Sequence, residues 1–142
     1  MPGSPFAFLD GPTPIAMAHR GGAIEHLENT MPAFQSCVDL GYRYLETDVQ
    51  VTADGVLVAF HDPTLERVTD RKGRIEHLTW AEVSQARIGG REPILRLDDL
   101  LGAWPDVRFN LDIKAAGVLA PLVRTVRRLG AVDRMAAAVR AS

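Results

Sequence analysis

Three carboxylates and two histidines stand in this sequence at positions from which they could act on one substrate. Glu46 and Asp48 are two residues apart, and Asp112 lies in a second segment with a similar pattern. Carboxylate oxygens are the ligands that hard cations such as Ca²⁺ and Mg²⁺ prefer. His19 and His61 carry imidazoles, which can take up or release a proton near neutral pH. Together these residues predict a metal-assisted acid/base site.

Two basic residues accompany this set. Arg20 directly follows His19, and its planar guanidinium suits the oxygens of a phosphate. Lys114 follows Asp112 at a spacing of two and would add a point charge. Both side chains suit the binding of a phosphate, and both equally suit a structural ion pair with the nearby acids. Each residue alone also has an ordinary structural interpretation, such as an ion pair or a charged strand face, so the prediction rests on the combination.

Alternating and apolar segments predict the strands that would carry these side chains. Residues 44–51 alternate, which places Glu46, Asp48 and Gln50 on one face of a strand. Further strands are expected at residues 15–18, 107–113 and 135–139. Helices are expected between them: one with Asn29 and Thr30 as N-cap residues, a short one opened by a capping box at 79–82, and two near 97–104 and 118–129.

A hairpin is predicted directly after the alternating strand. Asp54 and Gly55 form a strong turn signal between residues 49–51 and 56–60. Counting outward from a two-residue turn places His61 opposite Asp48. The second arm of such a hairpin runs antiparallel to the first, because a parallel neighbour needs a long crossover. The hairpin is therefore expected to decorate a parallel sheet.

Strands that alternate with helices or long connections indicate an α/β protein with a parallel sheet and helices outside it. The reactive residues stand near the carboxyl ends of the predicted strands. Barrels and open sheets of the α/β class keep their sites at that end.

Composition sets limits on location and partners. The chain has 142 residues, 46% of them hydrophobic, and a formal charge of −2, which gives a nucleic acid little electrostatic attraction. Residues 1–14 are interrupted by proline and glycine and read as an N-terminal extension without the features of a signal peptide. No segment is apolar for long enough to span a membrane. With one cysteine, Cys37, a cytoplasmic location is the expectation.

As a set, these residues and their neighbours resemble the glycerophosphodiester phosphodiesterase family. The motifs that carry the resemblance occur in the order and spacing of the family: His19-Arg20-Gly21, Glu28-Asn29-Thr30, Glu46-Thr47-Asp48-Val49, Thr52-Ala53-Asp54-Gly55, His61-Asp62 and Asn110-Leu111-Asp112-Ile113-Lys114. Leu27 stands where the family usually has proline, and Asp112 where glutamate is more usual. Because aspartate is one methylene shorter than glutamate, the carboxylate of Asp112 reaches less far toward a metal.

The resemblance implies a TIM-type (β/α) barrel that hydrolyses glycerophosphodiesters to sn-glycerol 3-phosphate and an alcohol. It implies that Glu46, Asp48 and Asp112 hold a divalent cation, Ca²⁺ or Mg²⁺. His19 and His61 would share acid and base catalysis. By the same resemblance Arg20 would bind the substrate phosphate, and Lys114 would assist.

The chain, with 142 residues, is shorter than a complete barrel of this type, which needs about 250 residues. Residues 15–142 are therefore expected to be the N-terminal portion of such a domain, with three to four parallel strands and the hairpin. Truncation of a longer protein is the leading explanation, and self-association through open sheet edges is another. Two alternative functions remain, a noncatalytic half-barrel interaction module and a phospholipase D-like lipid phosphodiesterase.

Overall fold

The computed structural model describes residues 17–20 and 27–139, and for residues 18, 19, 138 and 139 it describes the backbone alone. The predicted extension at 1–14 lies outside the described residues. The strands are β1 (Met17–His19), β2 (Tyr44–Val51), β3 (Leu57–Ala59), β4 (Arg87–Ile88), β5 (Glu92–Pro93), β6 (Leu95–Arg96), β7 (Arg108–Ile113) and β8 (Met135–Val139). The α-helices are α1 (Met31–Asp39), α2 (Trp80–Val83), α3 (Leu97–Ala103) and α4 (Leu119–Arg128). Short 3₁₀ turns lie at Ile75–His77, Ala116–Val118 and Val132–Arg134.

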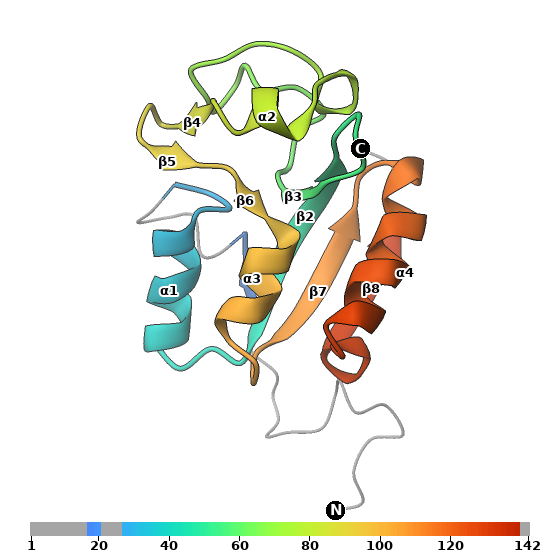
Figure 1. Cartoon of the computed structure of the whole chain (residues 1–142). Helices are drawn as coiled ribbons and strands as arrows, with labels where there is room; N and C mark the ends of the chain where they lie inside the picture. Colours follow the sequence, from blue (N-terminus) through green and yellow to red (C-terminus); the bar gives the residue numbers. More distant parts are fainter. Residues whose placement is uncertain (1–16, 21–26, 140–142) are drawn as a thin grey trace, which may run out of the picture.

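Strand β2 is the centre of the main sheet. It pairs in parallel with β1 and β7, and β7 pairs in parallel with β8. Strands β3 and β6 continue the sheet in the antiparallel sense. The order β6-β3-β2-β7-β8, with β1 beside β2, confirms the predicted parallel strands and the antiparallel hairpin arm. In Figure 1 the arrows of β2 and β7 point to the same end of the molecule.

One face of this sheet is covered by helices. In Figure 1 helices α3 and α4 lie in front of the strands, and α1 lies at their side. Leu45, Phe109 and Leu111 point to this side and are fully buried in one apolar cluster with Phe34 of α1 and Leu100 of α3. The alternation of each strand therefore places the other set of side chains, which includes the acidic residues, on the opposite face.

A second apolar cluster supports the segment that follows β3. Phe60, Leu65, Ile75 and Ile88 are buried there with Val83 of α2. This segment carries α2 and the β4–β5 pair at the end toward which β2 and β7 point (Figure 1). The cluster gives the connection between β3 and β6 a packed core of its own, next to the carboxyl ends of the parallel strands.

The predicted register of the hairpin is wrong by one residue. Val51 pairs with Leu57 and Val49 with Ala59, so Thr52 and Val56 are the next opposed residues and three residues, 53–55, form the loop. Thr52 and Val56 close it through a backbone hydrogen bond, and Gly55, the last loop residue, has a φ of +83°. A three-residue loop that ends in a left-handed glycine is the next commonest hairpin connection after the two-residue turn.

Because of this shift, Asp48 lies opposite Phe60. The amide of Phe60 donates to the carbonyl of Asp48 at 3.0 Å. His61 follows directly, and its carbonyl accepts a hydrogen bond from Nε2 of Gln50 at 3.0 Å. The hairpin therefore still brings His61 to the polar face of β2.

The predicted N-cap of the first helix is also wrong in its chemistry. Thr30 occupies the N-cap position of α1 but makes no capping bond with its side chain. Its hydroxyl instead donates to the carbonyl of Leu27. The capping box of Thr79 and Glu82 is confirmed at the start of α2.

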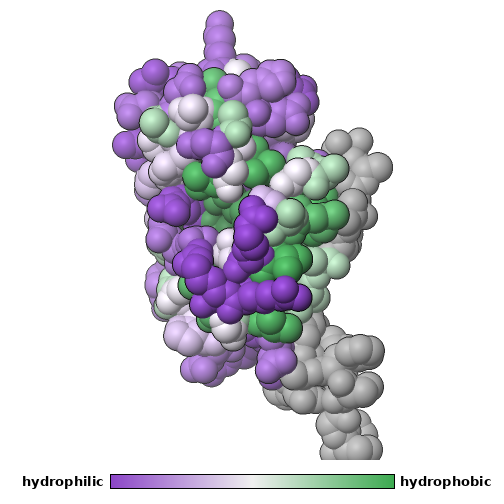
Figure 2. Space-filling view, turned by 45° about the vertical axis from the view of Figure 1, so that its right-hand side comes forward, coloured by the Kyte–Doolittle hydropathy of each residue, from purple (hydrophilic) through white to green (hydrophobic). Residues whose placement is uncertain are grey.

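The surface near α4 carries exposed apolar side chains. Figure 2 shows hydrophobic atoms between hydrophilic ones on the side turned forward. Leu119 and Val123 of α4 are each about half exposed, at 46% and 47%. Self-association through open sheet edges stays a prediction. Among the described residues, no helix has the length and apolar character that a membrane crossing requires.

Candidate active site

The three predicted metal ligands meet on the polar face of β2 and β7. Asp48 of β2 and Asp112 of β7 are direct partners in the parallel register, and Glu46 stands two residues before Asp48. Each residue offers a carboxylate oxygen, and these oxygens all lie within 4.8 Å of one another. All three residues are buried, Asp48 completely. Two neighbouring strands thus hold three acids at one point.

Two cations partly compensate this buried negative charge. Nζ of Lys114 lies 3.1 Å from Oδ2 of Asp112 and 3.8 Å from Oδ1 of Asp48. Nε of Arg20 lies 3.4 Å from Oδ2 of Asp48. Among the side chains that the structure describes here, three carboxylates face two cationic groups, and one of these, Arg20, also contacts Glu28, so negative charge is in excess. A buried excess of this kind is unfavourable unless a further positive charge or a proton neutralises it.

The acceptor atoms of the cluster fit a cation. Oδ1 of Asp48 and Oδ1 of Asp112 are buried, and neither accepts a hydrogen bond within the described part of the chain. Buried carboxylate oxygens normally have hydrogen-bond partners, so such atoms require an explanation. Oxygen donors of this type bind Ca²⁺ and Mg²⁺. The cluster therefore has the composition and the open acceptor positions of a divalent cation site.

The environment of Glu46 reflects the same excess of charge. Burial raises the pKa of Glu46 from 4.5 to about 7, and the neighbouring charge of Asp48 adds to the rise. The backbone amide of Arg20 donates to Oε2 of Glu46 at 3.2 Å and opposes the shift. Near neutral pH the carboxyl of Glu46 is thus protonated in part when no cation is bound.

This shift predicts a pH-dependent stability. The pKa of Glu46 is about 7 in the folded state, and its usual value is 4.5. Protonation of Glu46 therefore favours the folded state: this contribution to the free energy of unfolding is fully present below pH 4.5 and is lost as the pH rises through 7. Thermal unfolding with a chelator should therefore show that Glu46→Gln raises the melting temperature more above pH 7 than near pH 4.5. An equal effect of the substitution at the two pH values would contradict the raised pKa of Glu46.

The two predicted acid/base histidines are described to different extents. His61 follows β3, has a side chain 29% exposed, and its Nδ1 lies 2.7 Å from Oδ1 of Asp62. The backbone of His19 closes β1, where its Cα pairs with that of Glu46. The side chain of His19 lies outside the described residues. Both histidine positions thus adjoin β2, and their catalytic roles stay predictions.

Arg20 and Lys114, the predicted phosphate ligands, lie at this cluster. Arg20 has a φ of +50°, and its backbone amide donates to the carbonyl of Glu46. Its guanidinium lies between Asp48 and Glu28. Lys114 is 8% exposed at its side chain, and its amide continues the pairing of β7 with β2 through the carbonyl of Val49. Phosphate binding by these two side chains stays a prediction.

Asn29 is a site residue that the sequence interpretation assigned to helix capping. Its Nδ2 donates to Oδ2 of Asp48 at 3.2 Å, and its Oδ1 accepts from the hydroxyl of Thr47 at 2.9 Å. Asn29 is buried and has a φ of +55°, a region that asparagine tolerates better than most residues. It therefore holds the orientation of a predicted metal ligand. The available sequence signal for a role of Asn29 in the site was its position within the motif Glu28-Asn29-Thr30.

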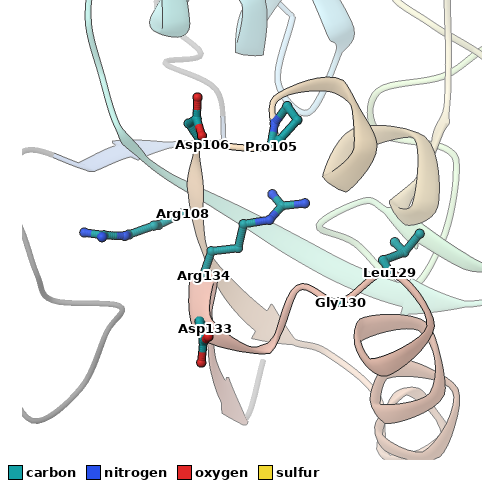
Figure 3. Close-up of a pocket in the computed structure, with 7 residues that line it drawn as sticks. All are labelled: Pro105, Asp106, Arg108, Leu129, Gly130, Asp133 and Arg134. Carbon is teal, nitrogen blue, oxygen red and sulfur yellow. The ribbon is translucent and has the colours of Figure 1, made fainter.

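A cavity of about 420 Å³, shown in Figure 3, is lined by none of the residues of the acidic cluster. It is lined by Pro105, Asp106, Arg108, Leu129, Gly130, Asp133 and Arg134. These residues stand before β7 and β8 or at their first positions, whereas the acidic cluster stands toward the ends of β2 and β7. Arg134 is occupied by the backbone carbonyls of Leu101, Trp104 and Val107. We therefore assign this cavity a structural role and not a catalytic one.

Comparison with known proteins identifies the family. A model of the glycerophosphoryl diester phosphodiesterase family matches residues 19–139. The chain belongs to this family. The match runs from the last residue of β1 to the end of β8 and includes every predicted site residue of this glycerophosphodiester phosphodiesterase family member.

Three similar proteins illustrate the relationship. "Probable glycerophosphodiester phosphodiesterase 2" of Mycobacterium tuberculosis is 45% identical over 122 residues, which are 85% of this chain and 46% of that relative. A glycerophosphodiester phosphodiesterase structure from Agrobacterium tumefaciens matches with a TM-score of 0.83 at 30% identity, over 89% of this chain and 57% of that one. An Oleispira antarctica phosphodiesterase, solved with the product sn-glycerol-3-phosphate, matches with a TM-score of 0.75 at 28% identity, over 81% and 52%.

The family gives the sheet its wider context. The structural relatives have a TIM-barrel fold, and the described sheet is a mostly parallel α/β sheet that does not close within the described residues. The predicted partial barrel is confirmed. The chain spans about half the length of the relatives it matches.

Proposed function

We propose that this chain carries the cation site and acid/base residues with which its family hydrolyses glycerophosphodiesters, which makes it a phosphoric diester hydrolase. The products would be sn-glycerol 3-phosphate and an alcohol. The observation that supports this most is the cluster of Glu46, Asp48 and Asp112, in which two buried oxygens accept no hydrogen bond within the described part of the chain. The product bound to the Oleispira antarctica relative supports the substrate class.

Glu46, Asp48 and Asp112 would hold the divalent cation, Ca²⁺ or Mg²⁺. A cation in such a site supplies positive charge that stabilises the negative charge developing on phosphate oxygens. Arg20 and Lys114 would add to this field and orient the phosphate. Much of the catalysis would therefore be electrostatic stabilisation and positioning.

His19 and His61 would move the protons. Hydrolysis breaks the bond between phosphorus and the alcohol oxygen, and that oxygen must receive a proton as it leaves. One imidazole would donate this proton, while the other would accept a proton from the attacking oxygen. The attacking oxygen belongs to water, or to the neighbouring glycerol hydroxyl when a cyclic phosphate forms first. In the direct route the pair would return to its starting protonation by exchanging protons with the solvent. In the cyclic route water would then open the cyclic phosphate with the two histidines in exchanged roles, which would restore the pair.

An assay of product release tests this function. The chain is incubated with glycerophosphocholine and Ca²⁺ or Mg²⁺, and sn-glycerol 3-phosphate is measured by its enzymatic oxidation. We expect release with the cation and loss of release with excess chelator. Lysophosphatidylcholine is the parallel substrate, because faster release of choline from it would support the phospholipase D-like alternative. Cation binding without hydrolysis of either substrate would support the noncatalytic module and contradict the proposal.

A further inference from the structure

Arg67 joins two carboxylates that stand far apart in the sequence. It lies in the segment after β3, and its Nε and Nη2 donate to the two oxygens of Asp62 at 2.7 and 3.1 Å. Its Nη1 donates to Oε1 of Glu28 at 2.9 Å. A two-pronged contact of this kind fixes both the position and the plane of the carboxylate. Asp62 is therefore held in one orientation by the fork of Arg67.

The same oxygen of Asp62 that accepts from Nη2 of Arg67 also faces His61. Oδ1 of Asp62 lies 2.7 Å from Nδ1 of His61. Hydrogen bonds from Arg67 lower the pKa of Asp62, so this carboxyl is ionised and acts as an acceptor. An acceptor at Nδ1 places the imidazole proton on that nitrogen and leaves Nε2 as the basic atom. The backbone of His61 is held separately, through Gln50.

The second carboxylate that Arg67 binds, that of Glu28, connects it to the other side of the site. Oε1 of Glu28 binds Arg67, and Oε2 of Glu28 lies 3.4 Å from Nη1 of Arg20. Arg20 in turn contacts Asp48. A continuous chain of charged contacts thus runs from His61 through Arg67 to the acidic cluster.

We propose that Arg67 is a positioning residue of the hydrolysis: through Asp62 it fixes the tautomer and ring orientation of His61, so that Nε2 is presented to the substrate. This inference rests on the proposed function, in which His61 exchanges a proton with the substrate. Arg67 itself touches neither the acidic cluster nor His61 in any contact of the described residues. Its effect would pass through the orientation of Asp62, as when a carboxylate holds a catalytic imidazole in its working tautomer.

The chain offers a matched control for an ordinary surface ion pair. Arg74 pairs with Glu76 through Nη2 at 2.8 Å and Nε at 3.1 Å, and the side chains of Arg67 and Arg74 are both 49% exposed. Exposed pairs of this kind contribute little to stability. If Arg67 were only a surface residue, Arg67→Ala and Arg74→Ala would have the same small effects.

The first measurement follows the His61 ring by ¹H–¹⁵N correlation spectroscopy of the chain, with the signals assigned through His61→Gln. We expect the wild-type protein to show a single tautomer protonated at Nδ1 in the neutral ring. Arg67→Ala should shift the ¹⁵N signals toward a mixture of tautomers, and Arg67→Lys should lie between, since lysine lacks the guanidinium fork. Arg74→Ala should leave the signals unchanged. Unchanged signals in Arg67→Ala would overturn the proposal.

The second measurement is turnover of glycerophosphocholine. We expect Arg67→Ala to lower kcat about 10- to 100-fold, the range typical when a side chain that orients a functional group is removed, with little change in KM. In an Asp62→Asn background, Arg67→Ala should add little further loss, because the two substitutions interrupt the same contact. If Arg67→Ala lowered kcat by the same factor in the Asp62→Asn background as in the wild type, the proposal would be overturned. A wild-type chain without turnover whose His61 signals nevertheless respond to Arg67→Ala would contradict the proposed function and support the coupling of Arg67 to His61.

Discussion

Asp48→Asn should lower kcat/KM for glycerophosphocholine by about 100-fold or more, as expected when charge stabilisation at the reacting phosphate is lost. Asparagine keeps the shape of the side chain but removes the charge at the centre of the cluster. Asp48 contacts Arg20, Lys114 and Asn29 and is fully buried, so water from the solvent cannot take the place of its carboxylate.

The measurement is release of sn-glycerol 3-phosphate at saturating Ca²⁺ or Mg²⁺. Asp99→Asn serves as the control, because Asp99 is an exposed residue of α3 outside the acidic cluster. Thermal unfolding should confirm that both variants fold. An Asp48→Asn variant with kcat/KM within about threefold of the wild type would exclude Asp48 as a metal ligand in the reaction.

His61→Ala should lower kcat by about 100-fold or more, the effect expected for loss of a general acid or base. The side chain of His61 is partly exposed and is oriented by Asp62, so its removal should disturb the core very little. His19→Ala should have an effect of the same size, because in the proposed mechanism each imidazole would carry out one of the two proton transfers.

Single-turnover and steady-state kinetics with glycerophosphocholine measure this effect. His77→Ala is the control, since the side chain of His77 is 70% exposed and faces Glu76. Added imidazole should restore part of the activity of His61→Ala and none of the activity of Asp48→Asn. A His61→Ala variant with kcat within about threefold of the wild type would remove His61 from the proton-transfer step.

The sequence predicted the parallel strands and the acidic cluster because both depend on local periodicity, whereas the two-residue strands β4, β5 and β6 are too short to show such a period. The alternation around Glu46 and Asp48 has a period of two, and only a strand places such residues on one face. Asp112 lies near the end of a second strand with the same alternation, and parallel strands bring equivalent positions together. These two facts were sufficient to expect three carboxylates at one point.

The hairpin register and the role of Asn29 depend on information that local patterns do not contain. Asp54-Gly55 is compatible with a loop of two or three residues, and the left-handed φ of Gly55 at the third position selects the longer one. Asn29 precedes a helix and has capping chemistry, yet its amide turns to Asp48 because a buried carboxylate needs a donor.

Arg67 was not predicted as a functional residue because nothing near it in the sequence shows periodicity. Its partners are Asp62, five positions before it, and Glu28, thirty-nine positions before it. Only the packing of the segment after β3 against the start of α1 brings the three side chains together. Contacts of this range require the fold.

Calorimetric titration of Ca²⁺ or Mg²⁺ into the chain above pH 7, where Glu46 is ionised, tests most directly whether the acidic cluster holds a cation. The expected result is one cation bound per chain, with binding lost or strongly weakened in Asp48→Asn and in Asp112→Asn and unchanged in Asp99→Asn. Absence of binding by the wild type, or equal affinity in the wild type and both cluster variants, would contradict the cation site and the hydrolysis built on it.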